Sequence, residues 1–321
     1  MITIKCLNEP DLNWNKRLLQ SPTGTIYQTK EMAKYFEKTL GYEHSYLQFL
    51  DQTGKIVGQL LLSKQKTLSK NYVKNLLRKI SSKTSLYRWI YGPTIFDTNS
   101  GSEIIKELYT FFKKINFPIS GSEHPLMSKF FSNTISKFKL QSWSTFLIDL
   151  SLSENILLEK MNKRSAQKNI ERSLKKNILV KEIKKSKLHD YYKMLAETKE
   201  KVGHKSLYEN VLFHWKSLHP IGFTGFMAYN DETPIGGIMV SNFNNYINEW
   251  GIARTKFDME NRTYAQDLLK WNIIQWGKRT NAHYYDLTGV NPYPVTSKES
   301  GILRYKQKWG GNWVKYNLIK I

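Results

Sequence analysis

The chain has 321 residues, of which 40% are hydrophobic and 13% aromatic, so it is long enough for two domains and is not disordered. Its 49 Lys and Arg residues against 27 Asp and Glu give a formal charge of +22 and a pI near 9.7. This charge favours an anionic partner, such as nucleic acid, a nucleotide-linked substrate or an acidic membrane surface. A genome rich in AT codons would also supply many lysines, so both explanations stay open.

The single cysteine, Cys6, excludes an intrachain disulfide and a cysteine-based metal cluster. We expect it to be a small buried residue, because it follows Ile2 and Ile4 in a strand pattern. No basic head precedes an apolar run at the N-terminus, and no apolar stretch approaches the roughly 20 residues that span a bilayer. We therefore expect a cytoplasmic monomer without a transmembrane segment, and leave contact with a membrane surface open.

Short strands and helices alternate in the first half of the chain, which predicts a mixed α/β domain. The strands are expected at 2–6, 44–50, 55–62, 87–91 and 146–150, and the helices at 30–40 and 102–115. A basic segment at 63–85 interrupts this order and is interpreted as a loop with a short helix. The pattern restarts at Ser153, a candidate helix cap, so we divide the chain into domains 1–150 and 151–321. An alternative arrangement, in which roughly the last ten residues pack back on the first domain, stays open.

The second half contains a helix, a meander of three strands, another helix and a final strand. The expected elements are a basic helix at 160–176, a helix from 181 to 194 and onward, strands at 223–229, 235–242 and 246–252, a helix at 265–279 and a strand at 285–287. This order is that of an acyltransferase-type domain of the GNAT fold. The first half shows a comparable mixture of elements.

The region after the last predicted strand combines a polar loop with a basic aromatic corner. Thr288 and Gly289 end the strand, and the prolines at 292 and 294 exclude regular structure in the loop. The chain then returns through Gly301 to Lys306, where neighbouring aromatic side chains would restrict water. Such a lysine can stabilise a developing negative charge, although a surface lysine on a hairpin gives the same pattern.

Three separated segments, in the right order, resemble the Fem family of peptidoglycan-bridge aminoacyltransferases. The family ending YDLGG…GIxxFKxxFGG is similar to the segment at 285–289 followed by GILRYKQKWGG at 301–311. The family opening QSPxG…Q…WAK is similar to QSPTG at 20–24 with Gln28 and Ala33-Lys34, although Met32 replaces the tryptophan. The basic segment at 160–178 resembles the family's basic helix, which ends in a KKGV-like turn.

The resemblance implies two tandem GNAT-like acyltransferase domains that share a cleft, in the short form without a coiled-coil arm. It also implies transfer of an amino acid from aminoacyl-tRNA to the amine of a cell-wall peptide precursor or a related anionic muropeptide. Aminoacyl-tRNA would be the co-substrate, and no cofactor or metal is implied. Ester aminolysis needs mainly positioning and oxyanion stabilisation, because the ester is already activated.

The catalytic candidates are Lys306, which takes the place of the lysine in the family's FK pair, and Tyr305, which replaces the phenylalanine. Lys306 would stabilise the transferred acyl group, and Tyr305 would keep the aromatic wall. Asp286, at the end of the strand, is grouped with the substrate-binding candidates. We expect it to fix the loop by hydrogen bonds and not to ligate a metal.

The other substrate-binding candidates follow from the acceptor's diphosphate and its amine. Lys205 and Lys34 lie where the family has basic residues that meet the acceptor. If the register of the first segment were shifted by two, Phe36 would take the place of Lys34. Glu123 or His124 would replace the aspartate that the family often has near the acceptor amine. Solvated lysines and a polar turn explain the same residues without a function.

The predicted basic helix is the candidate surface for the tRNA. Its candidate tRNA-binding residues are Lys163, Arg164, Lys168, Arg172 and Lys175. No aromatic residues are interleaved with them, so binding would follow the phosphate backbone and not the sequence. A solvated helix face fits the same pattern.

Two other readings stay open. An N-acyltransferase that uses acyl-CoA would need a glycine-rich turn for the pyrophosphate, but the corresponding stretch at 258–265 has no glycine and carries two acids. This argues against CoA in the second domain and leaves the first domain open. The third reading is a basic RNA-binding protein on a decayed transferase scaffold.

Overall fold

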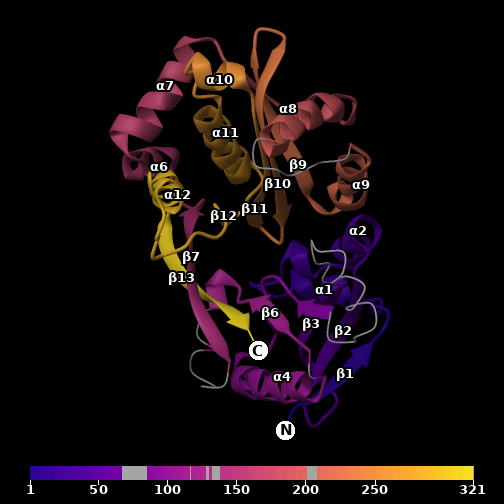
Figure 1. Cartoon of the computed structure of the whole chain (residues 1–321). Coiled ribbons are helices and arrows are strands. Elements are labelled where there is room, and N and C mark those ends of the chain that lie inside the picture. Colours follow the sequence, from indigo (N-terminus) through magenta and orange to yellow (C-terminus); the bar gives the residue numbers. More distant parts are fainter. Residues whose placement is uncertain (67–84, 116, 128–129, 132–137, 201–207, 321) are drawn as a thin grey trace. The chain divides into compact units, whose positions relative to one another are not determined.

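The computed structural model describes residues 1–66, 85–115, 117–127, 130–131, 138–200 and 208–320 (Figure 1). These residues form two compact units, one made of Met1–Ser144 with Lys315–Ile321 and the other of Thr145–Val314. Two strands, β7 (Lys139–Asp149) and β13 (Asn312–Lys320), pass from one unit into the other. The chain therefore enters the second unit once and returns once.

The first unit has a mixed sheet in the order β1-β2-β3-β4-β6-β13, with β5 paired to β3. Its other strands are β1 (Thr3–Leu7), β2 (Glu43–Leu50), β3 (Ile56–Lys66), β4 (Ser85–Arg88), β5 (Thr94–Ile95) and β6 (Ile119–Ser122). Its α-helices are α1 (Trp14–Leu19), α2 (Lys30–Leu40) and α4 (Gly101–Ile115). Neighbouring strands are antiparallel except β4 and β6, which are parallel.

Helices cover both faces of this first sheet. A Cβ on Gly58 of β3 would meet the Ile104 side chain of α4, whereas the next residue, Gln59, donates to the backbone oxygen of Trp14 in α1. Successive side chains of a strand point to opposite faces, so α4 and α1 lie on opposite sides of β3. The core includes Phe49, Leu60 and Ile104, all fully buried.

The second unit has the sheet order β7-β12-β11-β10-β9-β8, in which only β11 and β12 run parallel. Its other strands are β8 (Leu179–Glu182), β9 (Phe223–Asn230), β10 (Thr233–Phe243), β11 (Tyr246–Arg254) and β12 (Tyr284–Asp286). Its α-helices are α6 (Glu154–Lys160), α7 (Lys168–Lys175), α8 (Leu188–Glu200), α9 (Tyr208–Leu218), α10 (Lys256–Glu260), α11 (Ala265–Arg279) and α12 (Ser297–Gln307).

Two glycines of β10 show that this second sheet is also covered on both faces. A Cβ on Gly236 would meet Gln266 of α11, and one on Gly237 would meet Tyr191 of α8. The two helices therefore lie on opposite sides of the sheet, with α11 against the larger core cluster that includes Ile238 and Leu269.

Several predicted elements are confirmed, two helices at their predicted bounds and the meander within one or two residues of them. The helix at 30–40 is α2, which begins after the cap Thr29 and ends at Gly41 with φ of 66°. The helix at 265–279 is α11, and the predicted meander is β9, β10 and β11. Most of the basic segment at 63–85 lies outside the described residues, although β3 continues to Lys66 and β4 begins at Ser85.

Four predictions of local structure are wrong. The basic helix at 160–176 is broken, because Met161 is extended and the side chain of Asn162 accepts from two amides to start a π-helical turn at Lys163–Gln167. The helix expected from residue 181 begins only at Leu188, since Leu179–Glu182 pairs with β9 as a strand.

The segment before Lys306 is the helix α12 and not a loop or hairpin. Thr296 and Glu299 form a reciprocal capping box at its start. The last wrong prediction concerns Cys6, which is exposed because β1 forms the edge of the sheet.

Candidate functional site

Lys306 lies in the last turn of α12, in the second unit, and points into the loop that follows β12. Its Nζ donates to the backbone oxygens of Thr288 and Gly289, both at 3.0 Å, and to Thr288 Oγ1 at 3.3 Å. Burial lowers the pKa of Lys306 to about 8, against the opposing attraction of Glu249 and Asp286. The predicted lysine is therefore half-buried and held by oxygen acceptors.

Asp286 holds the loop that these acceptors belong to. Its fully buried carboxylate accepts from the Thr288 amide at 2.8 Å, Thr145 Oγ1 at 2.5 Å, Tyr246 OH at 3.0 Å and Asn248 Nδ2 at 3.4 Å. The expectation that Asp286 fixes the loop by hydrogen bonds agrees with these contacts. Because the carboxylate is saturated inside the protein, it reaches a substrate only through the loop that it positions.

The aromatic residues beside Lys306 surround other lysines. Lys308 Nζ lies 4.5 Å from the centroid of the Tyr305 ring and 5.4 Å from that of Trp309, and Lys270 Nζ lies 5.6 Å from the Tyr305 ring. The expectation that neighbouring aromatic side chains restrict water around Lys306 is not what these contacts describe, because adjacent residues on a helix face different directions. Tyr305 instead lies between the buried Lys270 and the half-buried Lys308.

The two lysines that contact Tyr305 each form an ion pair, and neither pair was predicted from the sequence. Lys270 of α11 pairs with Glu249 of β11, and Lys308 pairs with Asp267 of α11 at 2.5 Å. A lysine on the apolar face of a predicted helix was the available signal at Lys270, whose side chain is almost fully buried. A lysine is seldom buried in this way without a partner, so the pattern favours an ion pair at Lys270.

A basic pocket of about 720 Å³ opens beside this helix and is called the α12 pocket here. Its lining residues are Lys160, Asn162, Ser165, Arg304, Tyr305, Gln307 and Lys308. Among these described residues none has a carboxylate, and within the described chain neither Lys160 nor Arg304 forms an ion pair. The pocket therefore carries uncompensated positive charge next to the residue that precedes Lys306.

The predicted tRNA-binding residues lie on the surface of the second unit. Lys163 and Arg164 are in the π-helical turn, and the other three predicted residues are in α7; all five are exposed. The guanidinium of Arg172 lies 5.5 Å from the centroid of the Tyr264 ring. The π-helical turn with Lys163 and Arg164 adjoins the α12 pocket, because Ser165 of the same turn lines that pocket.

The candidates of the first unit have different surroundings, since Lys34 is exposed whereas Glu123 and His124 are buried. Lys34 is exposed on α2 and lines a pocket of about 510 Å³ together with the carboxylates of Glu9, Glu31, Glu37 and Glu43. An anionic acceptor would meet repulsion there as well as attraction. The substrate-binding candidate of the second half of the chain, Lys205, lies outside the described residues.

Glu123 and His124 are buried in the first unit. The Glu123 carboxylate accepts from the Asn317 amide at 2.8 Å, Asn317 Nδ2 at 2.7 Å and the Phe131 amide at 3.3 Å. Burial raises the pKa of Glu123 to about 7, against the opposing effect of these donors, and burial lowers the pKa of His124 to about 3. The contacts of Glu123 with Asn317 hold β13 against the rest of the unit, and a role of either residue near an acceptor amine stays a prediction.

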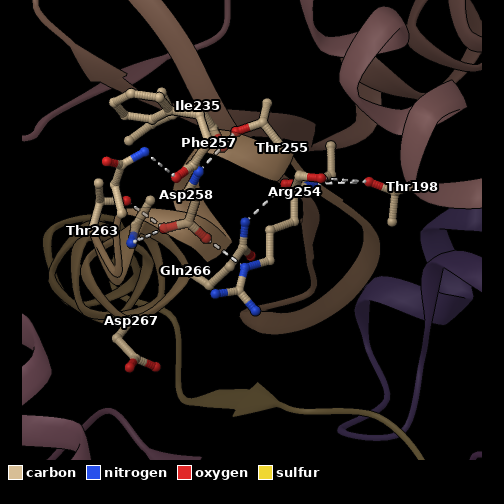
Figure 2. A network of polar contacts seen from close by, with 12 residues as sticks. Thr198, Ile235, Arg254, Thr255, Phe257, Asp258, Thr263, Gln266 and Asp267 are labelled. Carbon is tan, nitrogen blue, oxygen red and sulfur yellow. Dashed lines mark hydrogen bonds and ion pairs between the residues drawn. The ribbon is translucent and has the colours of Figure 1, made fainter.

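The turn between β11 and α11, which was compared with the CoA-binding turn, is filled by a carboxylate of the chain (Figure 2). Asp258 accepts from the Ala265 amide at 3.0 Å, from Thr263 Oγ1 and from Arg254 Nε at 2.5 Å. Figure 2 also shows Asp267 apart from this network, although it follows Gln266 directly. The first turn of α11, where a helix would receive a phosphate, therefore already holds a negative group.

The described residues contain no group of three or more His, Cys, Asp or Glu that could hold a metal ion. In the same part of the chain, every helix is too short or too polar to cross a membrane.

The chain is similar to three solved structures in particular. FemX matches with a TM-score of 0.74 and 12% identity, over 98% of this chain and 96% of that chain. L-PGS from Bacillus licheniformis matches with a TM-score of 0.56 and 10% identity, over 91% of each chain. A tandem GNAT protein from the clavulanic acid biosynthesis pathway matches with a TM-score of 0.52 and 12% identity, over 100% of this chain and 97% of that chain.

No protein-family model and no curated protein matches the chain. At these identities, the likeness to solved structures concerns the fold. The chain therefore has the α/β fold of FemX and of tandem GNAT proteins, with two GNAT-like domains.

Proposed function

We propose that the protein is an acyltransferase that moves an amino acid from aminoacyl-tRNA to the amine of a cell-wall peptide precursor. The observation that carries this proposal is the position of Lys306, held beside the basic α12 pocket by carbonyls of the β12 loop. The likeness to FemX supports it as an analogy at the level of the fold.

Lys306 can stabilise the tetrahedral intermediate of aminolysis. The acceptor amine attacks the ester carbonyl carbon and the new C–N bond forms. The bond to the ribose oxygen then breaks, and the proton lost by the amine nitrogen passes to that oxygen. An ammonium has three N–H donors, and its longest contact here is to Thr288 Oγ1 at 3.3 Å. Turning that donor to the carbonyl oxygen would stabilise the oxyanion while the two backbone carbonyls keep Nζ in place.

The α12 pocket and the exposed cations of the π-helical turn and α7 supply a surface for RNA phosphates. The pocket lies on the same helix as Lys306 but is not lined by it, so in this proposal the pocket holds phosphates of the tRNA strand and not the terminal ester itself. Binding through phosphates would be independent of sequence and would weaken with salt. The acceptor would be held by Lys34 and Lys205, which stay predictions.

The acyl-CoA alternative is opposed in the second unit by the Asp258 network. Pyrophosphate at the start of α11 would lie against the Asp258 carboxylate, which already takes the Ala265 amide. Because Asp258 already takes this amide, the turn lacks a free donor that a pyrophosphate would need there, which favours a donor substrate that binds elsewhere.

The test is transfer of a radiolabelled amino acid from charged tRNA to nucleotide-linked and lipid-linked muropeptides. Lys306→Met should reduce transfer at least a hundredfold, because the oxyanion loses its cationic donor. Lys298→Met is the matched control, since Lys298 is exposed at the start of the same helix. Equal rates for the two variants would refute the role of Lys306, and absence of transfer by the unaltered protein would refute the function.

A further inference from the structure

Glu249, Lys270 and Tyr285 form a buried charged cluster behind α12. Glu249 is 7% exposed and Lys270 is 1% exposed, and the two form an ion pair. Tyr285 OH donates to Glu249 Oε2 at 2.6 Å, and its ring centroid lies 5.7 Å from Lys270 Nζ. The cluster therefore joins β11, α11 and β12 in one contact network.

The cluster reaches the candidate site through Tyr305. Lys270 Nζ lies 5.6 Å and Lys308 Nζ 4.5 Å from the centroid of the Tyr305 ring, and Lys308 is itself fixed by Asp267. Tyr305, which directly precedes Lys306 in the chain, thus contacts the buried ammonium of Lys270 and the half-buried ammonium of Lys308. Contacts of a cation with a ring face favour one position of the ring.

Stability alone does not explain a buried ion pair at this place. Removing two charges from water is costly, and well-packed hydrophobic residues of similar volume are often as stable or more stable. The cluster lies next to a lysine whose charge the proposed chemistry requires, and its two charges act on that lysine in opposite directions.

We propose that Glu249 and Lys270, with Tyr285, are positioning residues that hold Tyr305 and set the electric field at the Lys306 ammonium. As a statement about catalysis this rests on the proposed function, but the effect on Lys306 can be measured without any substrate. None of the three residues has to contact a substrate.

Charged groups face Lys306 from each neighbouring element. Glu249 comes from β11, Lys270 from α11 and Asp286 from β12. Arg304 lies on α12 itself and Lys308 directly follows that helix, and neither is among the groups that shift the pKa of Lys306. Glu249 and Asp286 raise the pKa of Lys306 and Lys270 lowers it, whereas burial is the largest cause of its value of about 8. Removing the cation of Lys270 should therefore favour the charged form of Lys306.

The experiment measures the reactivity of Lys306 with acetic anhydride as a function of pH, by mass spectrometry of the labelled full chain. Only the neutral amine reacts, so the profile gives the lysine's own pKa. Lys270→Met should raise the midpoint by about one unit. The double variant Glu249→Gln/Lys270→Met should return it close to the unaltered value, because both opposing charges are then absent.

Lys270→Gln has the same expected shift and keeps a hydrogen-bond donor for Glu249, so it replaces Lys270→Met if that variant does not fold. Lys256→Met, at an exposed lysine of α10, is the control and should leave the profile unchanged. An unchanged Lys306 profile in a folded Lys270 variant would overturn the proposal. A shifted profile in a protein that transfers nothing from tRNA would sustain it while refuting the proposed function.

Discussion

Replacing Asp286 with alanine should destabilise the second unit by about 3 kcal/mol. The change removes a buried acceptor of four hydrogen bonds. Thr145 Oγ1 keeps a second acceptor, the backbone oxygen of Thr288 at 2.8 Å, and the hydroxyl of Tyr246 can rotate. The two N–H donors, from the Thr288 amide and the Asn248 amide group, cannot redirect in this way, and each costs about 1–2 kcal/mol when buried without its acceptor.

The assay is urea denaturation followed by tryptophan fluorescence and far-UV circular dichroism, with the free energy of unfolding taken from the transition of the second unit. Glu232→Gln, at the exposed turn between β9 and β10, is the control and should change that free energy by less than about 0.5 kcal/mol. A loss below about 1 kcal/mol in Asp286→Ala would refute the idea that this carboxylate holds the loop. Such a result would also remove the reason why the carbonyls of the loop lie at Lys306.

The remaining predictions concern pH, the start of α12 and RNA binding. Transfer should fall as the pH rises through about 8, because Lys306 then loses the proton that it offers to the oxyanion, and a rate profile of kcat against pH measures this. The folded-state pKa of Glu123 is raised from 4.5 to about 7, so the folded state binds this proton more tightly than the unfolded state does. The free energy of unfolding should therefore decrease as the pH rises from 4.5 to about 7. Glu123→Gln should flatten the decrease in urea titrations, and an equal slope would contradict the assignment. Thr296→Ala should cost about 1 kcal/mol by removing the capping box, and a thermal shift close to zero would argue against it. Arg304→Gln should weaken tRNA binding and make its salt dependence less steep, as measured by filter binding, whereas an unchanged slope would exclude a phosphate contact.

The fold could be predicted from the sequence because its periodic elements are strongly patterned. The helix at 265–279 alternates its apolar residues at helical spacing, and it forms α11 with the expected bounds. The strand with Asp286 was predicted from a different pattern, a run of aromatic and aliphatic residues that ends at a turn. Local caps were harder to weigh: Asn162 interrupts the predicted basic helix, and the capping box at Thr296 starts a helix where prolines suggested only a loop.

The candidate site could be predicted in part. Lys306 was located from its motif, but the sequence does not reveal which neighbours surround its ammonium, because those neighbours come from β11, α11 and the loop after β12. Lys270 and Glu249 are 21 residues apart and belong to different elements, so only the tertiary structure pairs them. The α12 pocket likewise depends on residues from two distant segments, around Asn162 and Arg304.

The most direct test of the central claim is a donor competition. The purified protein is given a muropeptide acceptor with charged total tRNA carrying one isotope and acetyl-CoA carrying another, and the acceptor is analysed by mass spectrometry. The account predicts an acceptor that carries only the amino acid from tRNA, with the signal abolished by ribonuclease treatment of the donor. An acceptor labelled from acetyl-CoA alone would contradict the account and would establish the acyl-CoA alternative.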